Sequence, residues 1–368
     1  MPAVTPSEAR VLNFLRGQPP WPTPEMYLSE ASSAIMAAVE SVLIERPSDP
    51  IAAIAVQLSH RAAADEPFRF LLNPVVDRHR AAADIEQVTI TFSAKSSRKP
   101  HFSDANIDEA WAAAKQRNPR LFDKSKFRLS RIDRRSDGCV HIHLGLTSYK
   151  EYMGTNRLPE EQRRALEEDG ERLHGDRTAF LSNALGVETV LVTSDGQVVL
   201  LRRSAAVTGG HGLYNGPSGH PEPLAAKLEA FADESGSNEN GVDDGWARRA
   251  CANRAAAFEL FDSVRQEIHE ETNVPLASLS PPRMIGCMAD SMGKPDLLFL
   301  TSTTLDAAGV RAAYAEGASE GWESDKLAFC ALDEFTVEGA ALRPKTAAAG
   351  LELTCVTRAA AVFFQQTR

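Results

Sequence analysis

The segment from Phe258 to Val274 constrains the fold more than any other part of the sequence. On a helical wheel, Phe261, Val264 and Ile268 lie within about 60° of one another. This spacing predicts a helix from about Glu259 to Thr272 that buries one apolar stripe.

Segments with strand character flank this helix in the sequence. Val187–Thr193 and Gln197–Arg202 are joined by an Asp195-Gly196 turn of the kind that connects hairpins. Residues 223–257 are interpreted as an insertion, because 233–245 is polar and poor in aliphatic residues. Further strands are predicted near 283–289, 296–302 and 327–332, and a last helix at about 344–360.

Residues 66–185 have an αβ pattern of their own. A helix is predicted over 104–118, where Pro119 follows the apolar spacing. His141 and His143 share one face of a strand, and such a pair suits a metal, but a solvent-facing strand is the preferred interpretation. The strands predicted in this part lie at 88–92, 127–129 and 139–144.

The N-terminal part, residues 23–62, predicts two helices. Thr23-Pro24-Glu25 begins the first, Pro47 ends it after Arg46, and Ser48-Asp49-Pro50 begins the second. Each helix has one apolar stripe, which a lone hairpin cannot cover. Self-association into a four-helix bundle from two chains is therefore expected.

Residues 27–63 resemble the dimerisation-and-docking hairpin of the kinase regulatory subunit (RII-alpha) and Dpy type. The resemblance lies in Glu45–Ile51, with Leu58 seven residues on. It implies a homodimer whose groove accepts an amphipathic helix from an anchoring partner. The alternative is an ordinary helical hairpin packed on the rest of the chain.

Length and charge exclude several classes of protein. The chain has 368 residues, which suggests two or three domains. A net charge of −10 argues against binding of nucleic-acid polymers. The five cysteines have no zinc or redox spacing, no apolar run of about 18 residues predicts a membrane span, and no secretory signal is recognised. A cytoplasmic protein is expected.

Three acids on the helix predicted over 259–272 indicate a possible metal site. Glu267, Glu270 and Glu271 share a sector of about 100° within about 6 Å of helix rise. Like charges this close repel, and hard divalent cations with oxygen ligands, Mg²⁺ first, relieve the repulsion. A solvated acidic face is the alternative. The acids border the buried stripe, however, and a glycine-rich turn at 216–222 lies upstream.

The same stretch resembles the motif of the Nudix hydrolases, G-x5-E-x7-R-E-U-x-E-E-x-G-U, where U is aliphatic. Glu267–Val274 matches its second half, except that Asn273 replaces glycine and Gln266 replaces arginine. Asparagine tolerates the left-handed conformation that glycine would supply at a helix end. Glu259 lies one residue off the motif's spacing and about 12 Å from Glu267 along the helix, so it is not expected to ligate the same ion.

Residues 120–358 resemble the divergent Nudix-type UDP-glucose pyrophosphatases, a branch that also lacks the motif's arginine and glycine. The resemblance implies an α+β fold: a Nudix α/β/α sandwich with a mixed sheet over 186–368, preceded by a substrate-binding α/β domain over 66–185 and the hairpin over 1–65. The segments that carry the resemblance are 121–129, 144–149, 154–156, 202–204, 217–223, 259–264 and 266–268.

The resemblance also implies roles for individual residues. Glu267 and Glu271 would be the principal ligands of Mg²⁺, with Mn²⁺ as an alternative, and Glu270 a further ligand, a water-mediated ligand or a base. Phe122 and Tyr149 would contact the nucleotide, unless they belong to the core. The residues that would line the diphosphate and sugar are Arg203, Ser204, His220 and Glu222, with Asn215 standing where the family has an acid.

The implied reaction is hydrolysis of UDP-glucose or UDP-galactose to UMP and a sugar 1-phosphate. A first alternative is a Nudix hydrolase of another nucleoside diphosphate derivative, such as ADP-ribose. A second is an anchored scaffold that works mainly through residues 23–62, with anchoring to a cytoskeletal or ciliary structure.

Overall fold

The computed structural model divides the chain into two compact units, Met1–Asp65 and Glu66–Arg368. The hairpin predicted over 23–62 lies outside the described residues, and every described element belongs to the second unit. The structure describes residues 68–72, 82–119, 121–135, 137–207, 210, 212–223, 228, 245–335 and 351–367.

The larger sheet contains eight strands among these residues, in the order β1-β9-β10-β5-β6-β11, with β7 paired to β6 and β8 to β5. Only the pairing of β10 with β5 is parallel, so the sheet is mixed, as predicted. The strands are β1 (Phe68–Phe70), β5 (Gly186–Val192), β6 (Gln197–Arg203), β7 (Tyr214–Asn215), β8 (Ser218–Gly219), β9 (Arg283–Asp290), β10 (Pro295–Ser302) and β11 (Ser324–Ala331).

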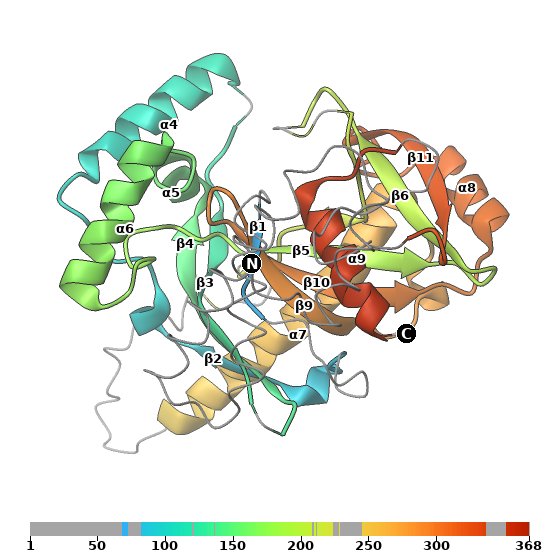
Figure 1. Ribbon diagram of the computed structural model, residues 1–368, viewed down its shortest axis with the longest axis horizontal. Coiled ribbons are helices and arrows are strands. Elements are labelled where there is room, and N and C mark those ends of the chain that lie inside the picture. The colour runs from blue at the N-terminus through green and yellow to red at the C-terminus, as the bar shows by residue number, and fades with distance from the viewer. Residues whose placement is uncertain are drawn as a thin grey trace, which may run out of the picture. The chain divides into compact units, whose positions relative to one another are not determined.

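Two helices cover opposite faces of this sheet (Figure 1). Val187 and Leu191 of β5 share a core with α7 (Gly245–Thr272), whereas Val190 packs in a second core with α9 (Cys355–Thr367). This alternation follows from the two-residue period of a strand. The expected α/β/α arrangement is therefore confirmed.

Helix α7 is longer than predicted, because it begins at Gly245 and not near Glu259. Residues 247–257 are rich in alanine and arginine, which favour helix, so the last part of the predicted insertion, 223–257, belongs to α7. The added turns lie against the smaller sheet, where Asn253 accepts a hydrogen bond from the backbone of Phe92 at 2.8 Å. One helix thus packs on both sheets.

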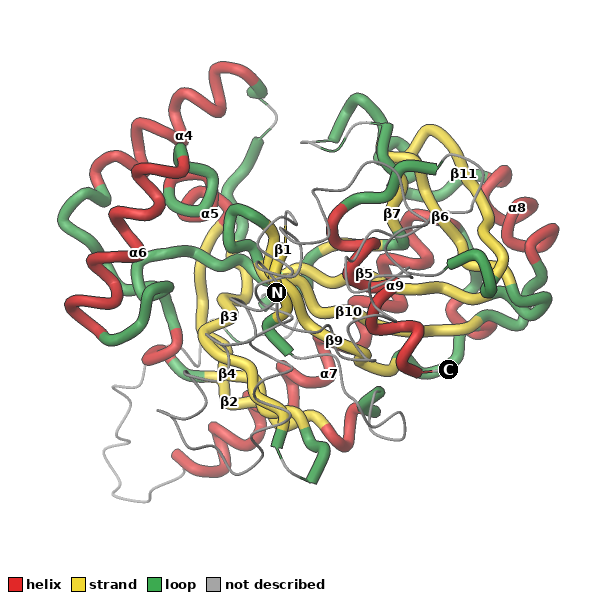
Figure 2. Tube along the Cα trace, viewed as in Figure 1, coloured by secondary structure: helices red, strands yellow, loops and turns green. Residues whose placement is uncertain are grey.

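The smaller sheet has the order β2-β4-β3, with β2 (Val88–Phe92) parallel and β3 (Ser125–Arg134) antiparallel to β4 (Val140–Ser148). The strand predicted at 88–92 is confirmed, the one predicted at 127–129 lies inside the longer β3, and the one predicted at 139–144 begins one residue later and extends to Ser148 as β4. Three helices lie together beside this sheet (Figure 2): α4 (Ala105–Arg117), α5 (Tyr149–Gly154) and α6 (Glu160–His174).

The last helix was placed too early by the sequence. It was predicted at about 344–360, but α9 begins only at Cys355. Leu353 pairs with Tyr214 in a β-bridge, so the chain is extended directly before the helix. The first turns of α9 therefore follow a strand-like segment.

His141 and His143 are half-buried on β4, with ring centroids 4.2 Å apart. His141 shares a hydrogen bond with the Thr91 hydroxyl at 2.8 Å. No group of three or more possible metal ligands in the described part of the chain includes this pair. The structure therefore gives no support to a metal site there.

Buried polar contacts fix the smaller sheet against the larger one. The guanidinium of Arg128, on β3, donates to the backbone carbonyls of Ser96, Thr178 and Leu181 at 2.8, 2.6 and 3.1 Å. Arg128 also pairs with Ala184, two residues before β5. Burial and neighbouring Arg98 lower the pKa of Arg128 to about 10, against the attraction of Asp176. These bonds hold the start of β3 beside the start of β5.

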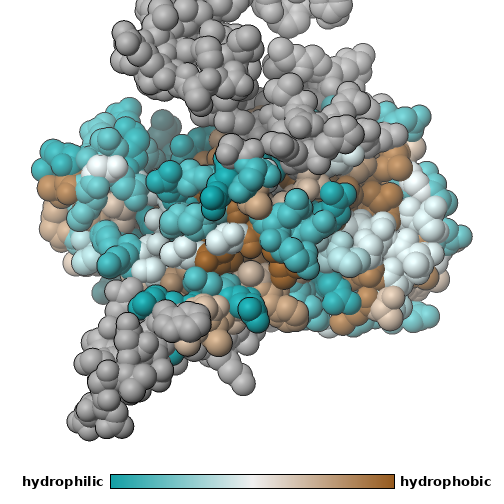
Figure 3. All heavy atoms as spheres, turned by 90° about the horizontal axis from the view of Figure 1, so that it is seen from below, coloured by the Kyte–Doolittle hydropathy of each residue, from teal (hydrophilic) through white to brown (hydrophobic). Residues whose placement is uncertain are grey.

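Large exposed apolar side chains are scattered singly, which is normal for a protein surface. The face drawn in Figure 3 likewise shows hydrophobic and hydrophilic residues interspersed. Among the described helices, none combines the length and the apolar character that a bilayer crossing requires. The exposed residues of this kind in the described part are Phe102, Phe122, Leu173, Phe258 and Trp322.

Candidate active site

Helix α7 presents its acids beside a buried stripe, as the wheel predicted. Phe261, Val264 and Ile268 are buried in the core that the helix shares with the larger sheet. Glu267 and Glu270 are half-buried, whereas Glu271 is only 5% exposed. The three acids therefore lie at the edge of the core and not on a solvated face.

An extended segment, residues 218–222, runs along α7. Every second backbone N–H of this segment donates to a glutamate of the helix. From Ser218 to His220 the chain advances by about 6.8 Å, which nearly matches the rise of about 6 Å over the four helix residues between Glu271 and Glu267. The third pair lies eight helix residues further along, about 12 Å from Glu267. The pairs are Ser218 with Glu271 at 3.1 Å, His220 with Glu267 at 3.1 Å, and Glu222 with Glu259 at 2.9 Å.

Gly219 permits this close approach. A Cβ at this position would lie 1.8 Å from Oε1 of Glu267, which is far inside a van der Waals contact. Only glycine lacks that atom, so the carboxylate of Glu267 can pass against the backbone. The sequence predicted a glycine-rich turn at 216–222, but residues 218–222 are extended, and Gly219 is required there by the close approach of Glu267.

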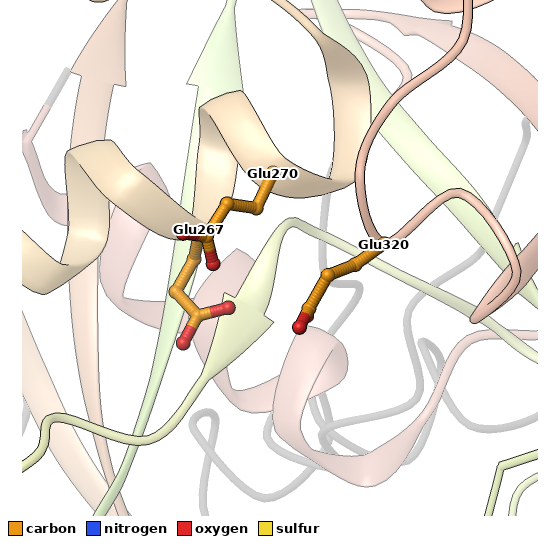
Figure 4. A group of neighbouring side chains, drawn as sticks. All are labelled: Glu267, Glu270 and Glu320. Atoms are coloured by element: carbon orange, nitrogen blue, oxygen red, sulfur yellow. The ribbon is translucent and has the colours of Figure 1, made fainter.

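Besides α7 and the 218–222 segment, the loop between α8 (Ala307–Glu316) and β11 contributes to the site. The backbone N–H of Glu320 donates to the carbonyl of Glu270 at 2.8 Å, which caps the end of α7. Carboxylate oxygens of Glu267, Glu270 and Glu320 lie within 4.8 Å of one another (Figure 4). Glu271 lies outside this group of three.

Glu320 was missed by the sequence analysis. The available signal was the acid-rich stretch from Glu316 to Asp325, which lies between a helix and a strand. Nothing in its spacing relates it to α7. Ser204, at the end of β6, holds the loop: its hydroxyl donates to the carbonyl of Trp322, and its N–H donates to that of Glu323, both at 2.8 Å.

The end of α7 confirms the reasoning about Asn273. This residue follows the last helical position and has φ of +57°, in the left-handed region. Its N–H donates to the carbonyl of His269 at 2.8 Å, and its side chain donates to that of Ala313 at 3.0 Å. Asparagine thus replaces glycine here without loss of the helix end.

The acids of the site hold their protons strongly in the absence of a cation. Burial, with repulsion from Glu320 and Glu270, raises the pKa of Glu267 to about 8. Burial and the charge of Glu267 raise the pKa of Glu271 well above its usual value. Burial also raises the pKa values of Glu320 and Glu323. Clustered oxygen donors that repel one another fit a hard divalent cation such as Mg²⁺.

Positive charge gathers around the His220–Glu222 segment. Removal of the His220 ring from water, together with Lys294, Lys126 and Arg203, lowers its pKa well below the usual value, so the imidazole is neutral. The carboxylate of Glu222 accepts a hydrogen bond from Lys124 at 2.8 Å. One wall of the site is therefore acidic, and the other carries several cations.

Phe122 is exposed, with the ammonium of Lys124 at 5.3 Å from its ring centroid. Tyr149 is half-buried with its ring 6.0 Å from that of Trp111, and its N–H donates to the carbonyl of Lys124 at 3.0 Å. Both aromatic residues therefore lie close to the residue that binds Glu222.

Asn215 and Arg203 lie on the paired strands β7 and β6. Asn215 is buried, and its amide donates to the hydroxyl of Ser218 at 2.8 Å, so it fixes the start of the 218–222 segment. Arg203 is half-buried at the last position of β6, where its N–H donates to the carbonyl of Leu213. Its charge acts on Glu271 and His220.

Comparison with known proteins identifies relatives at the level of sequence. The chain is 35% identical over 250 residues to uridine diphosphate glucose pyrophosphatase NUDT22 of Mus musculus. The aligned region covers 66% of this chain and 76% of that protein. The chain is 34% identical to the Homo sapiens protein of the same name, over 66% and 78% of the two chains. Nudix hydrolase 9 of Arabidopsis thaliana is 32% identical, over 67% and 79%.

Other comparisons are weaker. No protein-family model matches the chain. The crystal structure of DR0079 from Deinococcus radiodurans aligns with 50% of this chain and 85% of that chain, at 14% identity and a TM-score of 0.27, a likeness too weak to carry an argument. The sequence relatives suffice on their own. Because it shares about a third of its residues with proteins of which it covers more than three quarters, the chain belongs to the Nudix hydrolases.

Proposed function

We propose that this protein hydrolyses UDP-glucose or UDP-galactose to UMP and a sugar 1-phosphate, with Mg²⁺ as the cofactor. The observation that carries the proposal is the group formed by Glu267, Glu270 and Glu320, whose carboxylate oxygens lie within 4.8 Å of one another. The substrate class is supported by the names of the Mus musculus and Homo sapiens relatives.

The metal-binding residues are proposed to be Glu267, Glu270 and Glu320, with Glu271 as a further ligand or as a base. The raised pKa values of Glu267 and Glu271 fit this role, because a cation offsets the repulsion that burial intensifies. When bound, the metal supplies Lewis-acid activation of a phosphoryl group and a water of lowered pKa.

The chain's own residues orient the reactants and move one proton. Water adds to one phosphorus, the bond from that phosphorus to the bridging oxygen breaks, and the bridging oxygen keeps the electron pair on the departing phosphate. A carboxylate of the 267–271 group takes the proton of the water. We propose that neutral His220 and cationic Arg203 contact the diphosphate and that exposed Phe122 stacks on the base.

The test is a panel of substrates with the purified full-length protein and MgCl₂. UDP-glucose and UDP-galactose are expected to yield UMP and a sugar 1-phosphate in equal amounts, measured by chromatography. ADP-ribose and ADP-glucose serve as comparisons. Turnover of ADP-ribose with no turnover of either UDP-sugar would replace the proposed substrate with another nucleoside diphosphate derivative.

Matched variants show whether the measured turnover comes from this site or from a contaminating enzyme. Glu267→Gln is expected to abolish turnover, whereas Glu161→Gln, an exposed acid on α6, is expected to leave it unchanged. Equal activity of the wild type and Glu267→Gln on every substrate would refute hydrolysis at this site.

We also propose, from the sequence of residues 23–62, that the chain forms a homodimer able to dock an amphipathic helix. The unit boundary at Asp65 gives the position at which to delete this part. Light scattering is expected to give a dimer for the full chain and a monomer for a variant lacking residues 1–65. A monomeric full-length protein would refute the dimer.

A further inference from the structure

Lys126 reaches the active site from the smaller sheet. It is the second residue of β3 and pairs with Thr147 of β4, whereas the acids of the site lie on α7 and on the loop before β11. Arg128, two residues on, pairs with Ala184 just before β5. The position of Lys126 beside the larger sheet is therefore fixed by buried contacts and not by a mobile side chain alone.

Two lysines share one carboxylate at this point. The ammonium of Lys124 lies 2.8 Å from Oε1 of Glu222, and that of Lys126 lies 3.8 Å from the same oxygen. The side chain of Lys124 is 47% exposed, whereas that of Lys126 is 12% exposed. Glu222 neutralises one charge, and in the described part of the chain Lys126 has no closer anion. A largely buried ammonium is thus left with incomplete compensation.

Lys294 lies near the same segment. Asp296 pairs with Gly186, and Val187 pairs with Gly219, so His220 follows the ladder beside Gly186 at about 5 Å. A Cβ on Gly186 would lie 2.0 Å from Oδ1 of Asp296 and 2.4 Å from the ammonium of Lys294, so the ion pair of these two residues occupies the space above this glycine. The charge of Lys294 is therefore offset by Asp296, whereas Lys126 shares Glu222 with Lys124.

The electrostatics of Lys126 agree with this geometry. Burial lowers its pKa, Glu222 and Glu267 oppose that change, and Lys124 and Lys294 reinforce it. The ammonium therefore lies within the influence of Glu267 in the acidic group as well as of two other lysines.

We propose that Lys126 binds a phosphoryl oxygen of the diphosphate substrate, as a phosphate-binding residue supplied by the smaller sheet. The inference rests on the proposed function, since it assigns a contact for a substrate of the same site. An ammonium is a compact charge that forms short, charge-assisted hydrogen bonds to phosphate. Glu222 holds the exposed Lys124 and competes with the substrate for Lys126.

The test measures binding of inorganic pyrophosphate, which carries the diphosphate without a base or a sugar. Full-length protein with MgCl₂ is titrated by calorimetry. Lys126→Met is expected to weaken binding at least tenfold, and Lys126→Arg is expected to stay within about threefold of the wild type, because it keeps the charge. Lys115→Met, which removes an exposed lysine of α4, is the matched control and is expected to have no effect.

Glu222→Gln separates substrate binding from a merely structural ion pair. It is expected to tighten pyrophosphate binding, because it releases Lys126 from its competitor, so the two substitutions act in opposite directions. Equal weakening by Lys126→Met and Glu222→Gln would overturn the proposal. If Lys126→Met does not fold, as judged by circular dichroism, Lys126→Gln replaces it with the same expectation.

Pyrophosphate binding by Lys126 and hydrolysis of UDP-sugars are tested by different measurements, so either can be refuted without the other. A wild type that binds pyrophosphate through Lys126 but cleaves no UDP-sugar would refute the proposed function and leave this inference standing. A wild type that cleaves UDP-glucose, with Lys126→Met binding pyrophosphate as tightly as the wild type, would refute this inference alone. Absence of pyrophosphate binding to the wild type would also refute it.

Discussion

The two faces of the larger sheet hold glutamates with the same raised pKa in different surroundings. On the α9 face, burial raises the pKa of Glu188 to about 8 with added repulsion from one acid, Asp296, and its carboxyl oxygen accepts a hydrogen bond from Thr357 at 2.5 Å. On the α7 face, Glu267 also has a pKa of about 8, but there repulsion from neighbouring acids adds to burial. A buried acid outside a cluster avoids the cost of a buried charge by binding a proton, whereas the repulsion within a cluster of acids can be offset by a bound cation.

The largest effect on activity is expected from a substitution in the acidic cluster on the α7 face. Glu267→Gln removes an acid of the cluster and is expected to lower kcat for UDP-glucose by more than about 100-fold, since even indirect supports of a metal site are worth 10- to 100-fold. Steady-state kinetics at saturating MgCl₂ measure this loss. A loss below tenfold would place Glu267 outside the metal-binding set.

A steric change at Gly219 tests the same side of the sheet without removing an acid. Gly219→Ala would bring a Cβ to 1.8 Å from Oε1 of Glu267 and force that carboxylate to move. Displacement of a reacting or ligating group by about 1 Å costs on the order of 100-fold in rate. We expect a loss of this size in kcat, with a dissociation constant for Mg²⁺ that rises in parallel. Unchanged Mg²⁺ binding would contradict the role of Gly219.

The pH dependence of stability distinguishes the two faces. For an acid whose folded pKa is raised from 4.5 to about 8, the folded state binds more protons between these values, so stability falls as pH rises through that window. In metal-free protein we expect Tm to fall by roughly 5 °C or more from about pH 5 to about pH 8.

Magnesium should abolish only the part of this slope that comes from the cluster. The part from Glu188 should persist with MgCl₂ and disappear in Glu188→Gln. Differential scanning calorimetry at several pH values, with and without MgCl₂, measures both parts. A slope that is insensitive to MgCl₂ would refute cation binding by the cluster.

The smallest effect is expected on the α9 face. Glu188 is protonated at neutral pH, so Glu188→Gln replaces a neutral carboxyl with a neutral amide of similar shape. At about pH 5, where the pH-dependent term of Glu188 is still small, the free energy of unfolding is expected to change by about 1 kcal/mol or less, and kcat is expected to change by less than about threefold. Chemical denaturation and steady-state kinetics test both. A large loss of activity would mean that Glu188 acts in the site and not behind it.

Patterns that repeat along one element could be predicted from the sequence. The stripe through Phe261, Val264 and Ile268 and the acids beside it follow from the period of a helix. The left-handed Asn273 follows from the same helix, because an end position has its own conformational requirement. These features depend on residues that are near one another in the chain.

Features that depend on distant residues could not be predicted in this way. Glu320 reaches Glu270 only because the α8–β11 loop docks on the end of α7, and Lys126 reaches Glu222 across 96 positions. Tertiary contacts decided both of these positions, and no local period signals them. The start of α7 is different, because residues 247–257 favour helix by composition although they lack a clear apolar stripe, and they pack on the smaller sheet through Asn253.

The alternating hydrogen bonds between residues 218–222 and α7 set how the chain length may vary. Deleting or inserting one residue between Ser218 and Glu222 would break the alternation and turn at least one of these N–H groups away from the helix, and Pro221 has no N–H to replace it. Changes in length between the buried Leu228 and the start of α7 at Gly245 would leave these three bonds in place. Variation among natural or engineered versions of this protein is therefore expected to change the length of the chain between Leu228 and Gly245, and to keep the count from Ser218 to Glu222 constant.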